Sequence, residues 1–310
     1  MFDSIKNWLS QHDENYRIKL NRYDIIQVSG KDAAEFLHNQ FTSDVKGLAA
    51  DLSSLSAWCS IKGRVLYTFR LWHDKHIFYI QIPSAQTESF LKRLQMFILR
   101  ADVHIERTHL NVYGLFGEPF PEIAKVLPTT DNHVIAEKNT FLIRLPSPVT
   151  KNRFILITHE KSTHLIVGNE NDKHYTHWKL LDILTGIPEV LPQTADRFLP
   201  QMLDLERLGG LSFKKGCYPG QEIVARVKYR GELKKKLYKG ITKSNQQLEP
   251  GESLITLDDG KEFPAGNILN LVLIEDNLYP MLAVINIEAS SGHTLFVKSD
   301  REALFEILSN

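Results

Sequence analysis

The sequence predicts an α+β module followed by a small all-β unit. The chain has 310 residues, which is long for a single hydrophobic core, so we expect more than one domain. In the first two thirds, expected hairpins and helices alternate without a repeated strand–helix–strand pattern, which favours an α+β layer arrangement. After Gly231 the segments become short and apolar and are separated by Gly, Pro or acidic turns, which is typical of a small barrel or sandwich.

The expected elements of the first part come from hydrophobic periodicity and turn residues. Helices are expected to begin near residues 33, 84 and 174, the last one ending at Gly186 with Pro188 close behind. The expected strands lie at 24–29, 65–71, 77–82, near 103, at 110–116 and at 154–158.

The expected strands of the second part lie at 237–242, 253–257, 267–274, 282–287 and 294–297. The change of pattern near Gly231 is the clearest boundary in the sequence. We therefore expect a module over 1–232, with an internal break near 110, and a β unit over 233–310.

Composition excludes several function classes. Lys plus Arg and Asp plus Glu are equal at 37 each, so no overall field draws the chain to nucleic acid or to an acidic membrane. Cys59 and Cys217 are too few for a disulfide framework and indicate a reducing compartment. The start lacks a signal-peptide pattern, and no apolar run approaches the roughly 20 residues that span a bilayer. We expect a soluble, cytoplasmic protein without membrane contact.

A thiol motif at 214–222 is the main functional candidate. It consists of Lys214, Lys215, Gly216, Cys217, Tyr218, Pro219, Gly220, Gln221 and Glu222. The glycines and the proline predict a shaped loop, with a helix beginning at Gln221. Cations before the thiol and Arg226 after it favour the reactive thiolate, and amides at a helix start add to that effect. The alternative is that Cys217 is a small buried apolar residue in a tight turn.

Four segments of the chain carry a family resemblance. Residues 208–222, Leu-Gly-Gly-Leu-Ser-Phe-Lys-Lys-Gly-Cys-Tyr-Pro-Gly-Gln-Glu, resemble the signature of the YgfZ family. Residues 39–45 (Asn-Gln-Phe-Thr-Ser-Asp-Val), 61–65 (Ile-Lys-Gly-Arg-Val) and 197–202 (Arg-Phe-Leu-Pro-Gln-Met) resemble segments of the wider glycine-cleavage T-protein superfamily. The resemblance extends over most of the chain, from about Tyr23 onward.

The resemblance implies a fold and a role. The fold is a T-protein-like folate-binding α+β module of interleaved subdomains around a central opening, with a C-terminal antiparallel β-barrel. The implied ligand is tetrahydrofolate or a one-carbon derivative. The implied partners are iron–sulfur client or assembly proteins, with an effect on tRNA modification through such enzymes and at most an indirect or weak contact with tRNA. Cys217 would be the functional thiolate, supported by its motif neighbours and by Arg226.

The resemblance also suggests folate contacts. Tyr23 and Trp178 stand where the family has two folate-contacting aromatic residues, although packing in the core or on the surface is an alternative for each. Arg226 and Lys228 are candidate cations for the glutamate tail of folate, or for phosphates of a partner, with solvated charge as the alternative.

Two other functions remain open, and whether the chain is an enzyme is undecided. A T-protein-like one-carbon (aminomethyl) transferase is disfavoured because residues 63–68 lack the carboxylate that such chemistry needs. A non-enzymatic module could dock RNA or protein through the basic segment 228–236, which is equally consistent with a solvated linker. A metal site is not expected: the pairs His73/His76 and His174/His177 have no evident third ligand.

Overall fold

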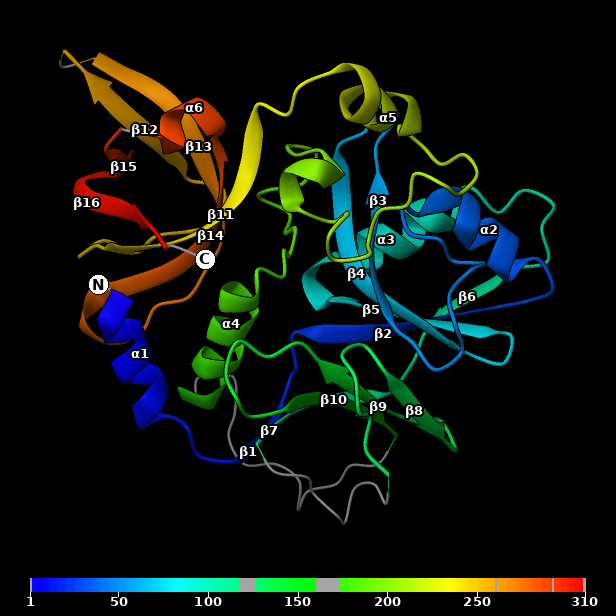
Figure 1. Cartoon of the computed structure of the whole chain (residues 1–310). Coiled ribbons are helices and arrows are strands. Elements are labelled where there is room, and N and C mark those ends of the chain that lie inside the picture. Colours follow the sequence, from blue (N-terminus) through cyan, green and yellow to red (C-terminus); the bar gives the residue numbers. More distant parts are fainter. Residues whose placement is uncertain (1, 118–125, 160–172, 260, 292, 309–310) are drawn as a thin grey trace.

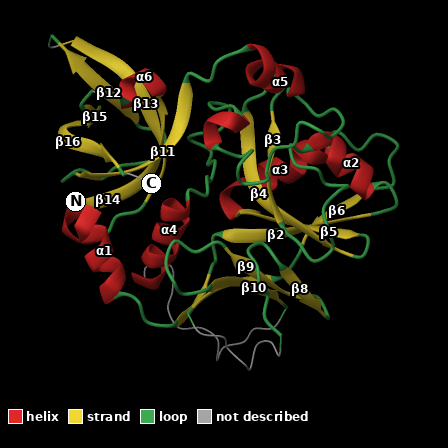
Figure 2. Cartoon of the chain, in the orientation of Figure 1, coloured by secondary structure: helices red, strands yellow, loops and turns green. Residues whose placement is uncertain are grey.

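The described residues form two five-stranded sheets and a closed six-stranded barrel (Figure 1). The computed structural model describes residues 2–117, 126–159, 173–259, 261–291 and 293–308. Figure 2 shows helices lying along the sheets and beside the barrel, so the architecture is mixed α+β with a C-terminal β-barrel. Among the described residues, no helix combines the length and the apolar character needed to cross a membrane.

The first sheet has the order β3-β4-β5-β2-β6 and is antiparallel throughout. Its strands are β2 (Tyr23–Ser29), β3 (Ser54–Cys59), β4 (Val65–Asp74), β5 (Ile77–Pro83) and β6 (His104–Arg107). Helices α2 (Ala33–Gln40) and α3 (Ser84–Gln95) pack against it. As the helical spacing predicted, Phe36, Leu37, Phe90 and Leu94 are buried in this core, and each such side chain stabilises the fold by roughly 1.5–3 kcal/mol.

The second sheet has the order β1-β7-β10-β9-β8. Its strands are β1 (Tyr16–Lys19), β7 (Asn111–Phe116), β8 (Val134–Glu137), β9 (Thr140–Leu145) and β10 (Arg153–Thr158). The first strand of the chain, β1, therefore lies in this second sheet. The chain then forms the first sheet and returns to the second one near residue 110, so the two halves of the module are interleaved. The domain limits at 110 and 232 themselves stay predictions.

The barrel closes in the order β11-β14-β13-β12-β15-β16. Its elements are β11 (Lys235–Lys243), β12 (Ser253–Asp258), β13 (Lys261–Leu271), β14 (Leu278–Asn286), β15 (Leu295–Val297) and β16 (Asp300–Ile307), with the short helices η3 (Glu275–Asn277) and α6 (Ile287–Ser290). All five segments expected after Gly231 overlap strands of the barrel. The sixth strand, β16, was not expected because most of its residues are polar or exposed.

The helix α1 (Phe2–Gln11) connects the barrel to the α+β module, where it lies beside α4 (Lys173–Thr185) (Figure 1). Ile5 and Trp8 of α1 are buried against Leu180 of α4 and against Ile241 and Leu278 of the barrel. The sequence reasoning did not expect α1, although its apolar residues recur at helical spacing.

A buried histidine lies at this junction. His177 of α4 is 1% exposed, and its Nδ1 lies 3.1 Å from the hydroxyl of Tyr16. His174, one turn earlier, has its Nε2 2.7 Å from a carboxylate oxygen of Glu14. Both imidazoles of this pair are therefore engaged with protein groups. In the described part of the chain, no group of three or more His, Cys, Asp and Glu side chains is placed to hold a metal ion.

The burial of His177 predicts a loss of stability in acid. Burial lowers the pKa of His177 to about 4 from an ordinary value of 6.5. Because folding favours the neutral ring, its contribution is complete above pH 6.5 and is lost as the pH falls toward 4. The loss of unfolding free energy over this pH range is roughly 3 kcal/mol.

The variant His177→Gln keeps a hydrogen-bonding group but removes the titration. Urea unfolding followed between pH 7 and pH 4.5 should show a smaller loss of stability in the variant than in the wild type. Identical pH dependence in the two proteins would contradict the assignment to His177.

Candidate functional site

The segments that carry the family resemblance meet around the thiol loop. Thr42, from segment 39–45, donates its hydroxyl to the carbonyl of Gly210 at 2.6 Å and accepts from the amide of Ala57 at 3.0 Å. Its own carbonyl accepts the amide of Ser212 at 2.9 Å. Segment 39–45 is thereby bonded both to the first sheet and to the start of the thiol loop.

Two glycine turns pack backbone to backbone beside Cys217. Gly63 and Gly220 have φ angles of +71° and +79°, in the left-handed region that favours glycine. A Cβ atom on Gly220 would lie 2.4 Å from the carbonyl oxygen of Ser60, so only glycine allows this approach. Segment 197–202 completes the contact: the side-chain amide of Gln201 donates to the carbonyl of Val224 at 2.6 Å.

Cys217 is exposed at this meeting point, whereas Cys59 is buried, and both thiols are free. Burial raises the pKa of the Cys59 thiol, so Cys217 is the thiol accessible for chemistry. Helix α5 (Gln221–Arg230) begins where the sequence predicted. The amides of Gln221 and Ile223 bond to the carbonyls of Tyr218 and Gly220, however, and so are not directed at the thiol.

The two lysines before the thiol have different roles. Lys214 is exposed. Lys215 is 9% exposed, and its ammonium donates to the carbonyls of His38 and Phe41 at the C-terminal end of α2. It also lies 4.9 Å from the ring centre of Tyr218. Burial lowers the pKa of Lys215 to about 8, so it is mostly protonated at neutral pH. Lys215 therefore caps helix α2 and fixes the thiol loop to it.

The other motif residues divide between packing and surface. Tyr218 is buried at 5% exposure, and Gly220 forms the turn before α5. Gly216 and the side chains of Glu222 and Arg226 are exposed, and Gln221 is half-buried at the start of helix α5.

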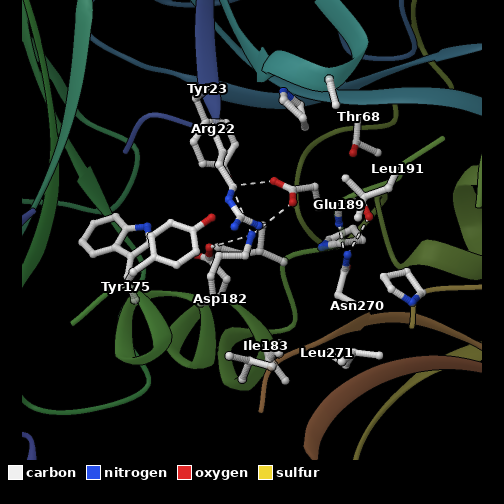
Figure 3. Close-up of a pocket in the computed structure, with 18 of the residues that line it drawn as sticks. Arg22, Tyr23, Thr68, Tyr175, Asp182, Ile183, Glu189, Leu191, Asn270 and Leu271 are labelled. Atoms are coloured by element: carbon white, nitrogen blue, oxygen red, sulfur yellow. Dashed lines mark hydrogen bonds and ion pairs between the residues drawn. The ribbon is translucent and has the colours of Figure 1, made fainter. Parts of the chain in front are cut away.

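A separate cavity of about 660 Å³ opens between the module and the barrel (Figure 3). Strands β2, β4 and β5, helix α4, residues 187–193 and barrel strand β13 form its walls. Tyr23 and Trp178 both line it, as the folate hypothesis requires of them. Cys217 is not among its lining residues, so the structure separates the two candidate centres.

Tyr23 belongs to a hydrogen-bonded network in this cavity. Its hydroxyl donates to Glu189 at 2.5 Å, and the ammonium of Lys179 lies 3.1 Å from both the Tyr23 hydroxyl and Glu189. Burial and the charge of Glu189 raise the pKa of Tyr23 well above its ordinary value, so the phenol keeps its proton. Figure 3 shows Tyr23 of the module near the Glu189 side chain and Asn270 of the barrel pointing toward the Glu189 backbone.

Trp178 forms a wall of the cavity rather than an exposed stacking platform. It is only 1% exposed, and its ring packs so close to Gly114 that a Cβ there would lie 2.9 Å from it. The guanidinium of Arg153 lies 5.3 Å from the ring centre and pairs with Asp182 at 2.9 Å. Trp178 therefore packs in the core and also lines the cavity, while its contact with folate stays a prediction.

The sequence reasoning missed the polar residues of the cavity. Lys179 and Asp182 follow Trp178 on α4, one and four residues later, and Glu189 follows the helix stop. Of these residues, only Asp182 has the i,i+4 spacing that places it on the same helix face as Trp178, which was a usable signal. Nothing in the sequence marked Asn270, which lies 81 positions after Glu189 and bonds to its backbone.

The candidate cations for folate do not line the cavity. Arg226 is exposed on α5, and Lys228 pairs with Glu206 at 2.6 Å. The basic segment 228–236 is divided among the end of α5, a connector and the start of β11.

The capping role of Lys215 predicts that its loss releases the thiol loop. The variant Lys215→Met leaves the carbonyls of His38 and Phe41 without their charged donor, which costs about 2 kcal/mol of stability. We expect faster amide hydrogen exchange in loop 212–220 and in the last turn of α2.

The neighbouring variant Lys214→Met is the matched control, since Lys214 is exposed. Its exchange rates should equal those of the wild type. If the two variants behave alike, Lys215 does not hold the loop.

Comparison with known proteins identifies the family. No protein-family model matches the chain. It is 32% identical over 294 residues to the tRNA-modifying protein YgfZ of Hamiltonella defensa subsp. Acyrthosiphon pisum (strain 5AT), covering 91% of this chain and 87% of that protein.

The fold has a solved counterpart. The crystal structure of the glycine cleavage system aminomethyltransferase T from Bartonella henselae superimposes with a TM-score of 0.75 at 12% identity, over 98% of this chain and 88% of that one. This likeness shows the fold alone and confirms the expected T-protein-like architecture with its C-terminal barrel. With the sequence identity to the Hamiltonella protein, the chain belongs to the YgfZ family.

Proposed function

We propose that this protein binds tetrahydrofolate, or a one-carbon derivative, in the cavity. We also propose that it supports the assembly or repair of iron–sulfur enzymes through the Cys217 thiolate. Its effect on tRNA modification would then pass through such enzymes, which agrees with the description of its relative as a tRNA-modifying protein. The observation that carries the proposal is the position of Tyr23 and Trp178, which both line the cavity between module and barrel.

The lining of the cavity suits a reduced folate. Its volume of about 660 Å³ lies within the range of small-molecule sites. Tyr23, Tyr175 and Trp178 supply aromatic surface for the pterin and benzoyl rings. Glu189 and Asp182 supply carboxylates that can accept hydrogen bonds from the amino and ring N–H groups of a pterin.

The thiol site suits a partner rather than a small ligand. Cys217 is exposed, and so are Glu222 and Arg226 of the helix α5 that follows the loop. The thiolate would hold a cluster transiently, or take a one-carbon group or a sulfane sulfur from a donor on a protein that docks there, with the donor's amine or thiolate as the leaving group. Lys215, bonded to α2, keeps the loop in one position for that encounter.

A one-carbon transferase is the second candidate, and the carboxylates of the cavity are the observation in its favour. Residues 63–68 contain no acid, but the fold brings Asp182 and Glu189 into the cavity from elsewhere. Each already pairs with a cation, Arg153 and Lys179 respectively. Because neither carboxylate is free of a cation, proton abstraction from an amine is the less favoured chemistry. Turnover of a methylene-donor amine with tetrahydrofolate, at a rate that does not depend on Cys217, would favour the one-carbon transferase.

The folate hypothesis predicts that the cavity tryptophan contributes to affinity. In calorimetric titrations, wild-type protein should bind tetrahydrofolate saturably, and Trp178→Phe should bind it roughly tenfold more weakly because ring area is lost. The Phe variant is chosen because an Ala variant would cost about 3–5 kcal/mol of core packing.

The variant Trp8→Phe is the control, since Trp8 is buried between α1 and the barrel and does not line the cavity. It should bind as wild type does. Absence of saturable binding by the wild type would remove folate from the proposal.

The thiol hypothesis predicts a variant that binds but does not function. Cys217→Ser should retain its melting temperature and its affinity for tetrahydrofolate, because the side chain is exposed and outside the cavity. It should fail to restore iron–sulfur enzyme activity in cells that lack the native gene.

Cys59→Ala is the matched thiol control: it removes a buried thiol, so it should reduce stability but keep the activity at permissive temperature. If Cys217→Ser restores the enzymes as well as wild type does, the thiol has no functional role.

A further inference from the structure

The cavity contains a buried cation that no carboxylate neutralises. Arg70 of β4 lines the cavity and is only 5% exposed. Its Nη1 donates to two neutral acceptors, the hydroxyl of Ser53 at 2.8 Å and the side-chain carbonyl of Asn132 at 2.7 Å. In the described part of the chain, its Nε and Nη2 groups have no hydrogen-bond partner and the guanidinium forms no ion pair.

The nearest acids are committed to other cations. Asp182 pairs with Arg153 at 2.9 Å, and Asp131 lies 3.5 Å from Arg144. Burial and the neighbouring charge of Arg153 lower the pKa of Arg70 to about 10, so it stays protonated at neutral pH. A buried charge without a partner is costly because it loses its hydration without gaining an ion pair.

The cavity lining carries three positive and three negative charges, but one of its carboxylates, Asp182, pairs with Arg153 behind the wall, so one positive charge of the lining has no paired carboxylate. Lys179 pairs with Glu189, and Asp182 pairs with Arg153. The exposed charged residues of the lining, Arg22 and Glu249, are opposite in sign. Among the described groups, the uncompensated charge is therefore that of Arg70, and a single negative charge would match it.

Gln81 places a second donor beside Arg70. The two residues are direct cross-strand partners on β4 and β5, and both line the cavity. Opposite residues in an antiparallel pair have Cβ atoms roughly 5 Å apart. The Gln81 side chain is nearly buried, at 6% exposure, and makes no hydrogen bond within the described residues. Its amide and two guanidinium nitrogens are thus available to one ligand group.

We propose that Arg70 and Gln81 form a carboxylate subsite of the cavity, which takes a glutamyl carboxylate of the reduced folate. The inference rests on the proposed function for the identity of the ligand. A carboxylate fits because it accepts two parallel N–H bonds from a guanidinium and brings the one negative charge that is missing. A neutral ring carbonyl would accept the bonds but leave the charge unbalanced. The subsite replaces Arg226 and Lys228, the cations expected from the sequence.

The test compares ligands with and without the tail. Tetrahydrofolate and 6-methyltetrahydropterin, which lacks the tail, are titrated calorimetrically into wild type, Arg70→Met, Arg70→Lys and Gln81→Leu. Arg70→Met should weaken tetrahydrofolate binding roughly 10- to 100-fold and leave the affinity for the pterin unchanged. Arg70→Lys should recover part of the loss.

The control is Arg107→Met, which removes an exposed cation of the same sheet that pairs with Asp24 outside the cavity. It should bind both ligands as wild type does. If Arg70→Met weakens the binding of both ligands equally, Arg70 contacts the pterin ring rather than the tail. If it weakens the binding of neither ligand, Arg70 does not bind the tail. Either result overturns the inference. If Arg70→Met does not fold, Gln81→Leu carries the test with the same selectivity for the tail.

Failure of the proposed function gives a different result. If wild-type protein binds neither reduced pterin, the folate proposal is wrong, and p-aminobenzoylglutamate then tests the subsite alone. If p-aminobenzoylglutamate raises the melting temperature of wild type but not that of Arg70→Met, a carboxylate subsite is supported. An equal change of melting temperature in the two proteins would overturn it.

Discussion

The segment that follows helix α4 connects the α+β module to the barrel, and the cavity depends on it. The backbone amide of Glu189 donates to the side chain of Asn270 at 2.9 Å, and its carbonyl accepts from the same amide group at 2.7 Å. The next amide, that of Val190, donates to the hydroxyl of Thr68 at 2.8 Å. Two adjacent residues are thus bonded to the barrel on one side and to the first sheet on the other. This leaves the Glu189 side chain directed into the space between them.

This arrangement explains why the cavity is polar at its centre. The pair of Lys179 and Glu189 would be costly to bury separately, because an unpaired charge loses its hydration. The hydroxyl of Tyr23 bonds to both members, so the three groups satisfy one another. Their mutual bonds fix Tyr23 at the end of β2, where its ring faces the cavity. The network therefore orients an aromatic wall while it keeps the charges compensated.

The sequence was sufficient for the parts of the fold that depend on local pattern. The periodic apolar residues of α2 and α3, the hairpin around Lys75 and the barrel segments after Gly231 were all readable. Strands β8 and β9 were missed, although they form a short hairpin of the second sheet. β16 was missed because only Ala303 and Phe305 are buried in it, so its polar residues conceal the alternation. Such strands are stabilised by their neighbours, which a local pattern does not contain.

The two candidate sites also differ in how far the local sequence predicts them. The thiol loop could be predicted because its glycines, proline and cysteine lie close together in the sequence, and Gly220 is required by a backbone contact with the turn at Gly63. The cavity network could not, because it joins residues far apart in the chain: Tyr23 and Glu189 are separated by 166 positions. Even within the thiol motif, the sequence could not tell Lys214 from Lys215. One is exposed and the other is a buried helix cap, and only the position of α2 makes that difference.

The separation of the thiol from the cavity constrains any mechanism that couples them. Cys217 is on a loop that is fixed to α2 and to the turn at Gly63. The cavity is lined by part of β4, the strand that follows this turn. Strand β4 begins at Val65, beside the Gly63 turn, and carries Thr68 and Arg70 into the cavity. The two centres therefore share one rigid strand, with a rise of about 3.3 Å per residue along it. The cavity residues Thr68 and Arg70 lie in the middle of β4, and Gly220 of the thiol loop packs on the Gly63 turn that precedes this strand, so β4 and its turn adjoin both sites.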